Sequence, residues 1–295
     1  MVDSHVLVVD GSSLLVRAFF ATAYSGRLMR SKSGVYTNGV QGFLNMLTGA
    51  CDIMGPSHLF VAWDVSRDTF RREIYPAYKA TRGELPDELH PQFDLARELL
   101  EHLGVAQQSD PRFEADDLIG SIVRKAECEG HRVTILTGDR DSLQLVSELV
   151  TVAIMKKGVK ELELYTPCRL QKEWGIGPDQ ITDLKALMGD TSDNIPGVPG
   201  IGEKTALKLL SEHGSIEELY SNLEKVKGKM REKLELHRES AFLSKHLATI
   251  VTEVPLEREI GDCRLQFLLE QAKERLLELE LHRVVSQLQR FTVTA

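Results

Sequence analysis

The chain has 295 residues, of which 42% are hydrophobic and 27% charged, a composition typical of globular proteins and unlike disordered or fibrous chains. Its formal net charge is −8, and an excess of acid usually counts against a nucleic-acid partner. The longest apolar runs are far shorter than the roughly 18–20 residues of a membrane span, and no secretory signal opens the chain. We therefore expect a cytoplasmic protein with no membrane partner.

The cysteines are scattered without CxxC spacing: Cys51, Cys128, Cys168 and Cys263. This pattern argues against a zinc site or a disulfide framework and favours free thiols in a reducing compartment.

Strand-like and helix-like segments alternate through the first half of the chain. Short apolar runs predict buried strands at His5–Asp10, His58–Asp64, Arg132–Thr137 and 149–155. Apolar residues at helical spacing, each set ending near a glycine, predict helices at 40–54, 96–103 and 118–128. Alternation of this kind predicts an α/β fold with a mostly parallel central sheet flanked by helices.

Two segments depart from this alternation. Residues 66–92 are basic and aromatic and then rich in proline, and from about Gly175 onward the pattern is almost wholly helical. The sequence thus predicts an α/β core over residues 1–174, followed by a helical region over residues 175–295.

Acidic residues recur where the predicted strands end. Asp10, Asp64 and Asp139 each follow a strand, and parallel strands place their carboxyl ends along one edge of a sheet. Further acids lie in short motifs, which gives nine candidates: Asp10, Asp64, Glu114, Asp116, Asp117, Asp139, Asp141, Asp190 and Asp193. Taken singly, each has an ordinary explanation as a helix cap or a turn residue.

Gathered together, these acids would need cations. Two carboxylates ~4 Å apart repel by about 4 kcal/mol at an effective dielectric constant of 20, and oxygen ligands suit hard divalent ions such as Mg²⁺ or Mn²⁺. Two such ions are a common device for in-line displacement at phosphorus. Without the nine acids, 36 cationic side chains face 35 acidic ones, so the net charge no longer argues against nucleic acid.

The segment from Gly197 to Ala206 has the pattern of a helix–hairpin–helix, a motif that we place at about residues 179–212. Backbone N–H groups at Gly200 and Gly202, with Lys204 and Lys208 beside them, would bind phosphate without reading bases. A glycine-rich connection used only for packing is the alternative.

A second basic element lies within residues 71–82. Arg71, Arg72, Lys79 and Arg82 can offset phosphate charge, and Tyr78 can stack on a base, although on composition alone a solvated helix face is the better explanation. Arg17, which follows the first acid, could reach the acidic site or pair with a neighbouring acid.

The order of these motifs resembles that of the 5′-nuclease family, which comprises flap endonucleases and the N-terminal 5′→3′ exonuclease domain of bacterial DNA polymerase I. The resemblance rests on seven motifs: Val9-Asp-Gly11 with Arg17, Trp63-Asp64, Tyr75–Arg82, Glu114-Ala-Asp-Asp117, Thr137-Gly-Asp-Arg-Asp141, Gly189-Asp-Thr-Ser-Asp-Asn-Ile-Pro-Gly197 and Gly200-Ile-Gly-Glu-Lys204. It implies a PIN-like nuclease core with two Mg²⁺ or Mn²⁺ ions. Asp10, Asp64, Glu114, Asp116 and Asp117 would serve the first ion, and Asp139, Asp141, Asp190 and Asp193 the second.

The resemblance also implies roles for the basic segments. Residues 66–92 would form a helical arch, in which Lys79 and Arg82 approach the scissile phosphate and Tyr78 stacks on a base. The hairpin would hold duplex DNA together with K⁺ near Val198 and Ile201.

The expected protein is a monomeric, bacterial, structure-selective 5′ nuclease acting on branched or flap DNA, including RNA–DNA primers. Two rivals remain open: a relative that binds branched DNA without cutting it, and a small acidic-site ribonuclease.

Overall fold

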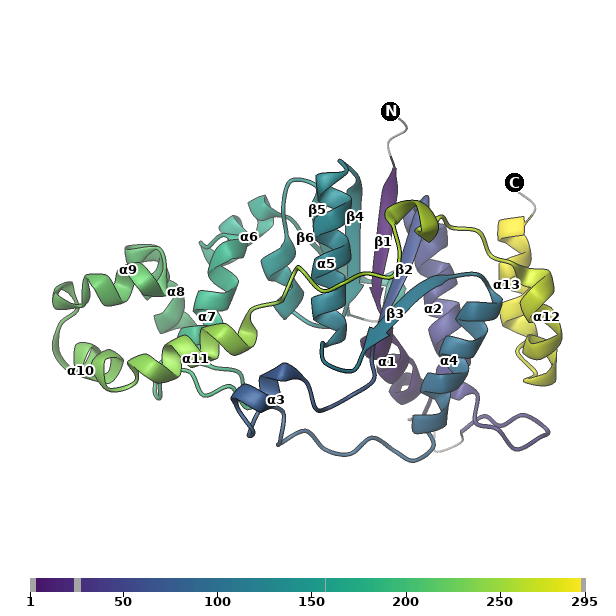
Figure 1. Cartoon of the computed structure of the whole chain (residues 1–295), viewed down its shortest axis with the longest axis horizontal. Helices are drawn as coiled ribbons and strands as arrows, with labels where there is room; N and C mark the ends of the chain where they lie inside the picture. The colour runs from purple at the N-terminus through teal and green to yellow at the C-terminus, as the bar shows by residue number, and fades with distance from the viewer. Residues whose placement is uncertain (1–3, 24–27, 157, 293–295) are drawn as a thin grey trace.

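The computed structural model describes residues 4–23, 28–156 and 158–292. A six-stranded sheet of order β3-β2-β1-β4-β5-β6 lies at its centre (Figure 1). The strands are β1 (His5–Asp10), β2 (His58–Asp64), β3 (Ala106–Asp110), β4 (Arg132–Thr137), β5 (Val150–Met155) and β6 (Leu162–Tyr165). All neighbouring pairs are parallel except β5 with β6, which is antiparallel. The predicted α/β class with a mostly parallel sheet is confirmed.

Helices cover both faces of the sheet. Successive side chains of a strand point to opposite faces, and in the central strands both sets of side chains are apolar and buried. Val6 and Val8 of β1 pack with α5 (Ala115–Cys128), whereas Leu7 and Val9 pack with α1 (Gly11–Ala23), α2 (Asn38–Met54) and α4 (His90–His102). The three helices expected from their spacing are therefore present, each beginning earlier in the chain than predicted.

The segment expected to form a helical arch contains little helix. Within residues 66–92, helix is found at α3 (Phe70–Ile74) and at the start of α4, and the residues between them form turns and irregular structure. Pro76 and Pro86 stand within this stretch, and proline opposes helix continuation because it lacks the backbone N–H.

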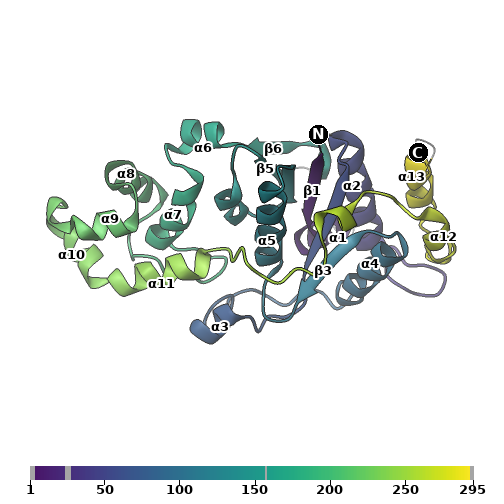
Figure 2. The ribbon, with the colours of Figure 1, turned by 45° about the horizontal axis from the view of Figure 1, so that its top comes forward.

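The helices after the sheet fall into two groups at opposite ends of the molecule (Figures 1 and 2). The first group comprises α6 (Pro167–Trp174), α7 (Ile181–Met188), α8 (Glu203–His213), α9 (Ile216–Ser221), α10 (Gly228–Leu236) and α11 (Arg238–Ala248). The chain then runs back along the core in mostly irregular structure, and α12 (Leu269–Glu278) and α13 (His282–Thr292) pack on α4 and α2.

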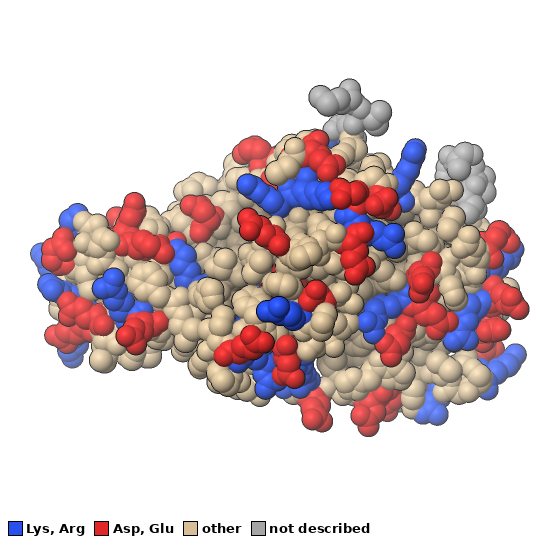
Figure 3. Space-filling model, viewed as in Figure 1, with Lys and Arg blue, Asp and Glu red and all other residues tan. Residues whose placement is uncertain are grey.

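Charge is mixed over the surface in the view of Figure 1. Lys, Arg, Asp and Glu side chains are interspersed there without a large area of one sign (Figure 3). Among the described residues, no helix is both long and apolar enough to cross a membrane.

Candidate active site

The carboxyl ends of β1, β2 and β4 bring Asp10, Asp64 and Asp139 to one edge of the sheet. Asp10 accepts hydrogen bonds from the Ser13 N–H and the Thr137 hydroxyl, both at 2.9 Å. Asp64 accepts the N–H of Ala115, the first residue of α5, at 2.9 Å. The bond to Asp64 ties the end of β2 to the start of the helix that carries the next acids, and the bond from Thr137 joins the ends of β1 and β4.

The charges of these acids act on one another. Burial and then the charge of Asp64 raise the pKa of Asp10 to about 7. The pKa of Asp116 is raised well above its usual range by burial and then by Asp139, Asp10 and Asp64. Asp10, Asp64, Asp116 and Asp139 therefore form one cluster of mutually repelling carboxyls, named here the edge cluster.

A second set of acids surrounds Lys185 of α7. Lys185 Nζ lies 2.6 Å from Asp141 Oδ1 and also pairs with Asp190. Burial and the neighbouring Asp139 raise the pKa of Asp141 to about 7 although Lys185 opposes the shift. Burial alone would raise the pKa of Asp190, but the hydrogen bonds from Lys185 and Ser192, together with the charge of Lys185, lower it.

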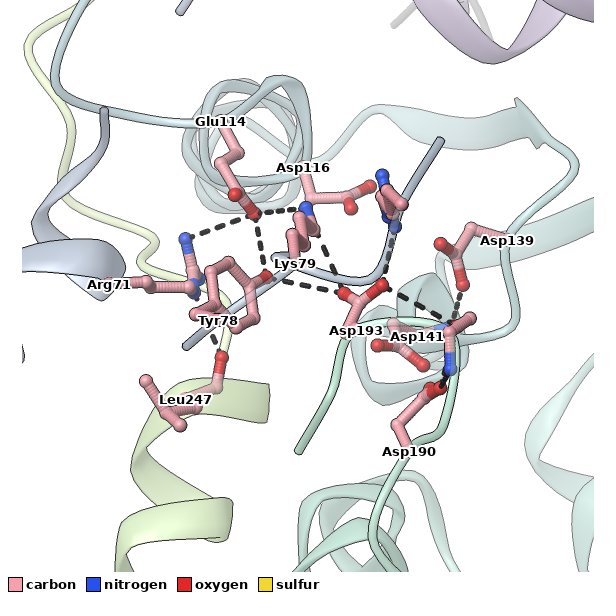
Figure 4. Close-up of polar contacts among 12 residues, drawn as sticks. Arg71, Tyr78, Lys79, Glu114, Asp116, Asp139, Asp141, Asp190, Asp193 and Leu247 are labelled. Carbon is pink, nitrogen blue, oxygen red and sulfur yellow. Dashed lines mark hydrogen bonds and ion pairs between the residues drawn. The ribbon is translucent and has the colours of Figure 1, made fainter. Parts of the chain in front are cut away.

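Two of the three remaining acids, Glu114 and Asp193, are held by residues that were expected to meet DNA (Figure 4). Lys79 Nζ lies 2.9 Å from Glu114 Oε2 and 3.8 Å from Asp193 Oδ2, and Arg82 pairs with Asp193. The Tyr78 hydroxyl donates to the same two carboxylates, at 3.1 and 3.3 Å.

Tyr78 is therefore not placed to stack on a base in this structure. Its side chain is 3% exposed, and burial followed by the charges of Glu114 and Asp193 raises the pKa of its hydroxyl. Stacking on a base therefore stays a prediction, and it requires the ring to leave the position in which its hydroxyl contacts Glu114 and Asp193.

Asp117 and Arg71, expected to serve a metal ion and DNA respectively, form a buried pair with each other in this structure. Asp117 is fully buried and Arg71 is 2% exposed, and two hydrogen bonds of 2.7 Å join the guanidinium to the carboxylate. Arg71 also donates to the carbonyls of Leu247 and Thr249, and Asp117 accepts from Val251 N–H. Neither side chain is free to contact a metal ion or DNA here.

The donor set fits hard divalent cations in its chemistry. The gathered side chains offer carboxylate oxygens, and the raised pKa values of Asp10, Asp116 and Asp141 report negative charge that burial leaves poorly balanced. As the side chains stand, however, no three His, Cys, Asp or Glu residues of the described part of the chain are grouped closely enough to hold a metal ion. Lys79, Arg82 and Lys185 instead neutralise several of the acids.

Two further basic candidates, Arg17 and Arg72, make their polar contacts with groups other than these nine carboxylates. Arg17 donates to the carbonyl of Lys156 at 3.1 Å and lies against Gly138, next to Asp139. Arg72 is partly exposed and pairs with Asp68 at 2.8 Å.

The predicted hairpin connects α7 to α8. Val198 and Ile201 are buried, and the Ile201 N–H donates to the Val198 carbonyl. Gly200 and Gly202 are exposed, and Gly202 directly precedes α8, with Lys204 and Lys208 exposed in the first two turns. The hairpin thus presents backbone and two lysines at a helix N-terminus.

Two residues that the structure places among the acids, Lys185 and Asn194, were not among the candidates predicted from the sequence. Lys185 lies five residues before Asp190 on the preceding helix, and this proximity to an acidic motif could have identified it as a candidate site residue. Asn194 follows Asp193 directly and has a left-handed backbone, with φ of 56°, a conformation in which Asn is enriched.

Comparison with known proteins identifies two family models along the chain. Residues 5–175 match the 5′-3′ exonuclease N-terminal resolvase-like domain, and residues 176–271 match the 5′-3′ exonuclease C-terminal SAM fold. Among curated proteins, DNA polymerase I of Streptococcus pneumoniae (strain R6) is 48% identical over 263 residues, which cover 89% of this chain and 30% of that protein. DNA polymerase I of Bacillus subtilis is 42% identical over 88% of this chain and 29% of its own length. The chain thus spans less than a third of these relatives.

Solved structures share the fold at low sequence identity. A T5 5′-exonuclease with bound zinc is 20% identical with a TM-score of 0.70, covering 97% of this chain and 99% of that one. The catalytic core of Rad2 in complex with a DNA substrate is 16% identical with a TM-score of 0.59, covering 98% and 93%. On the strength of the family models and the polymerase relatives, the chain belongs to the 5′-3′ exonuclease family.

Proposed function

We propose that the protein is a divalent-metal-dependent, structure-selective 5′ nuclease that cleaves DNA phosphodiesters near single-strand/duplex junctions, as a flap endonuclease and a 5′→3′ exonuclease. The observation that carries the proposal is the edge cluster, in which four carboxyls from β1, β2, α5 and the β4 loop repel one another. Such a cluster is costly unless cations bind it.

The acids divide between two metal positions in this proposal. Asp10, Asp64 and Asp116, with Glu114 beside them, would hold one Mg²⁺ or Mn²⁺, and the second would be held by Asp139, Asp141, Asp190 and Asp193. Asp117 is not assigned as a direct ligand of either ion because the Arg71 guanidinium donates to both of its carboxylate oxygens. Bound there, the ions would supply an activated water and stabilise the leaving oxygen. Solved T5 5′-exonuclease structures with divalent metal ions support a metal-binding role for this fold.

The basic residues would hold the DNA. Lys79 and Arg82, now paired with Glu114 and Asp193, would turn to the scissile phosphate once cations neutralise those acids, and Arg17 beside Gly138 would contact a neighbouring phosphate. Lys204 and Lys208, with the backbone of Gly200 and Gly202, would bind the duplex backbone, and the carbonyls of Val198 and Ile201 would coordinate K⁺. Arg72 would add an exposed charge.

The setting that fits this activity is the bacterial cytoplasm, with flap DNA and RNA–DNA primers as substrates and the chain acting as a monomer. The T5 flap endonuclease has been solved as a complex with DNA and metal ions, which supports DNA as the partner.

Cleavage of a labelled 5′-flap duplex with Mg²⁺ tests the proposal. We expect the wild-type chain to release the flap, Asp139→Ala to reduce cleavage to background, and Asp52→Asn, a change at an exposed acid of α2, to have no effect. Absence of cleavage by the wild type would leave a DNA-binding role only. Equal cutting of linear single-stranded RNA would instead favour a ribonuclease.

A further inference from the structure

Two segments that carry functional side chains are joined through their backbones. Residues 75–82, named here the basic turn, bear Tyr78, Lys79 and Arg82, and residues 190–195, the acidic loop, bear Asp190 and Asp193. The Lys79 N–H donates to the Asp193 carbonyl at 2.8 Å. The Asn194 side-chain amide donates to the Ala77 carbonyl at 2.7 Å.

Both ends of this junction have unusual backbone conformations. Lys79 and Asn194 lie in the left-handed region, with φ of 54° and 56°. Asn adopts this region more readily than most residues, whereas Lys does so at a cost and only where its surroundings hold it. The acidic loop is itself closed by paired hydrogen bonds between Asp190 and Ile195, at 2.8 and 2.9 Å. A rigid loop therefore presents Asn194 to a strained turn.

The junction determines where the side chains of the basic turn lie. With Lys79 N–H fixed on Asp193, the Lys79 ammonium reaches Glu114 and the Tyr78 hydroxyl reaches both acids (Figure 4). The Tyr78 ring packs with Ile195 of the acidic loop and with Leu247 at the end of α11. The basic turn is thus attached to the acidic loop by a backbone hydrogen bond, by side-chain contacts with Asp193 and by apolar packing on Ile195.

We propose that Asn194 is a positioning residue that holds the basic turn against the acidic loop and so places Lys79 for the reaction. The inference rests on the proposed nuclease function for its catalytic consequence only. Asn meets two requirements at once, because its backbone tolerates the left-handed region and its amide donates to Ala77. Glycine meets the first requirement alone, and alanine meets neither.

Trypsin sensitivity reports how often the basic turn leaves the acidic loop, and it does so independently of nuclease activity. Cleavage after Lys79, whose N–H is bound to Asp193 and whose ammonium is paired with Glu114, requires the basic turn to leave the acidic loop, and proteolysis follows the population of the open form. In metal-free protein without DNA, we expect Asn194→Gly and Asn194→Ala to be cut there about five- to tenfold faster than wild type, the effect of one lost hydrogen bond. Cleavage after exposed Lys227 serves as the internal reference.

Single-turnover flap cleavage measures the catalytic consequence. We expect both variants to lose about ten- to a hundredfold in rate at saturating DNA, as misplacement of a reacting group by ~1 Å does, while flap affinity measured with Ca²⁺ changes less than twofold. Asn222→Gly is the matched control, since the Asn222 amide also donates to a backbone carbonyl, that of Glu218, but lies outside both segments.

The results for Asn194→Gly and Asn194→Ala decide between a positioning role and a purely structural role for Asn194. If Asn194→Gly were as resistant to trypsin and as fast in flap cleavage as the wild type, the proposal would be overturned. Asn194 would then matter only for the left-handed conformation of its backbone. Faster proteolysis with an unchanged rate would overturn the positioning role. Should the wild-type chain cleave no flap DNA, the nuclease proposal fails, while the trypsin result still decides whether Asn194 holds the turn. Thermal melting confirms that Asn194→Gly remains folded.

Discussion

Asp10 combines good hydrogen bonding with an unfavourable electrostatic environment. It accepts from Ser13 and Thr137, yet burial and the charge of Asp64 raise its pKa to about 7. Folding therefore disfavours the ionised form of Asp10, and the folded chain holds the proton more tightly than the unfolded chain does. As the pH rises from about 4 to about 7, Asp10 accordingly lowers the free energy of unfolding. A bound cation would relieve the same cost.

We predict that Mg²⁺ raises the melting temperature more at pH 8 than at pH 6, because protons compete for the carboxyls at the lower pH. Asp10→Asn should raise the melting temperature of the metal-free protein at pH 8 and shrink its response to Mg²⁺. Differential scanning fluorimetry with and without Mg²⁺ measures both effects, and Asp52→Asn should behave as wild type. An equal Mg²⁺ response at the two pH values would contradict this account of Asp10.

Arg71 and Asp117 show how a charged pair can serve packing alone. The pair joins α3 and the start of α5 to the carbonyls of Leu247 and Thr249, where α11 ends. Removing one partner of such a buried pair leaves an uncompensated charge, which is strongly destabilising. Loss of activity in a variant of either residue would thus need a stability measurement before it could be assigned to DNA or metal binding.

At the scale of elements, the glycines of the α7–α8 hairpin have different reasons for being glycine. Gly197 has φ of 60°, and a Cβ there would lie 2.2 Å from the backbone nitrogen of Gly189. Gly202 has an ordinary extended backbone with φ of −99°, and a Cβ there would meet nothing within 4 Å. Gly197 is required by the fold, whereas Gly202 leaves its surroundings open to a ligand.

We predict that Gly202→Val weakens duplex DNA binding about tenfold, since the added side chain blocks approach of a phosphate to the N-terminus of α8. The melting temperature should change little because the space is open. Fluorescence anisotropy with labelled duplex checks the affinity, with Gly261→Val, also at an open position, as the control. Unchanged duplex affinity would remove Gly202 from the interface.

The central strands were predictable and the edge strands were not, for a physical reason. β1, β2, β4 and β5 are covered on both faces and so consist of apolar runs, whereas β3 (Ala-Gln-Gln-Ser-Asp) and β6 (Leu-Glu-Leu-Tyr) lie at the sheet edges and carry polar residues. Helical periodicity likewise identified helices in the last third of the chain without indicating that α12 and α13 return to α2 and α4.

Within the candidate site, strand ends made the convergence of Asp10, Asp64 and Asp139 predictable. The burial of Arg71 and Asp117 was not, because it depends on residues 247–251, some 130 to 180 positions away in the sequence. A motif of charged residues specifies chemistry, but tertiary packing decides which of its members remain accessible.

Across the whole molecule, the chain starts in the middle of the sheet and finishes on its outer helices. α12 and α13 cover the apolar face that α2 and α4 turn away from the sheet, and Leu276 and Leu288 are fully buried in this layer. Both helices lie largely beyond residue 271, where the match to the family model ends.

We predict that Leu288→Ala lowers the free energy of unfolding by about 2–5 kcal/mol, the usual cost of emptying a buried leucine site. Urea denaturation measures the loss, and Leu236→Ala, at a position 79% exposed, should change stability by less than about 0.5 kcal/mol. A neutral result for Leu288→Ala would mean that α13 contributes little to the core.

The return of the chain to its own beginning also constrains the order of folding during synthesis. β1, α1 and α2 are made before α13, and the part of the α2 surface that α13 covers stays exposed until α13, made more than 200 residues later, has emerged. At the usual ~5–20 residues per second, the nascent chain exposes that apolar surface for at least about ten seconds. We therefore expect this surface of the nascent chain to be bound by ribosome-associated chaperones until α13 has been made.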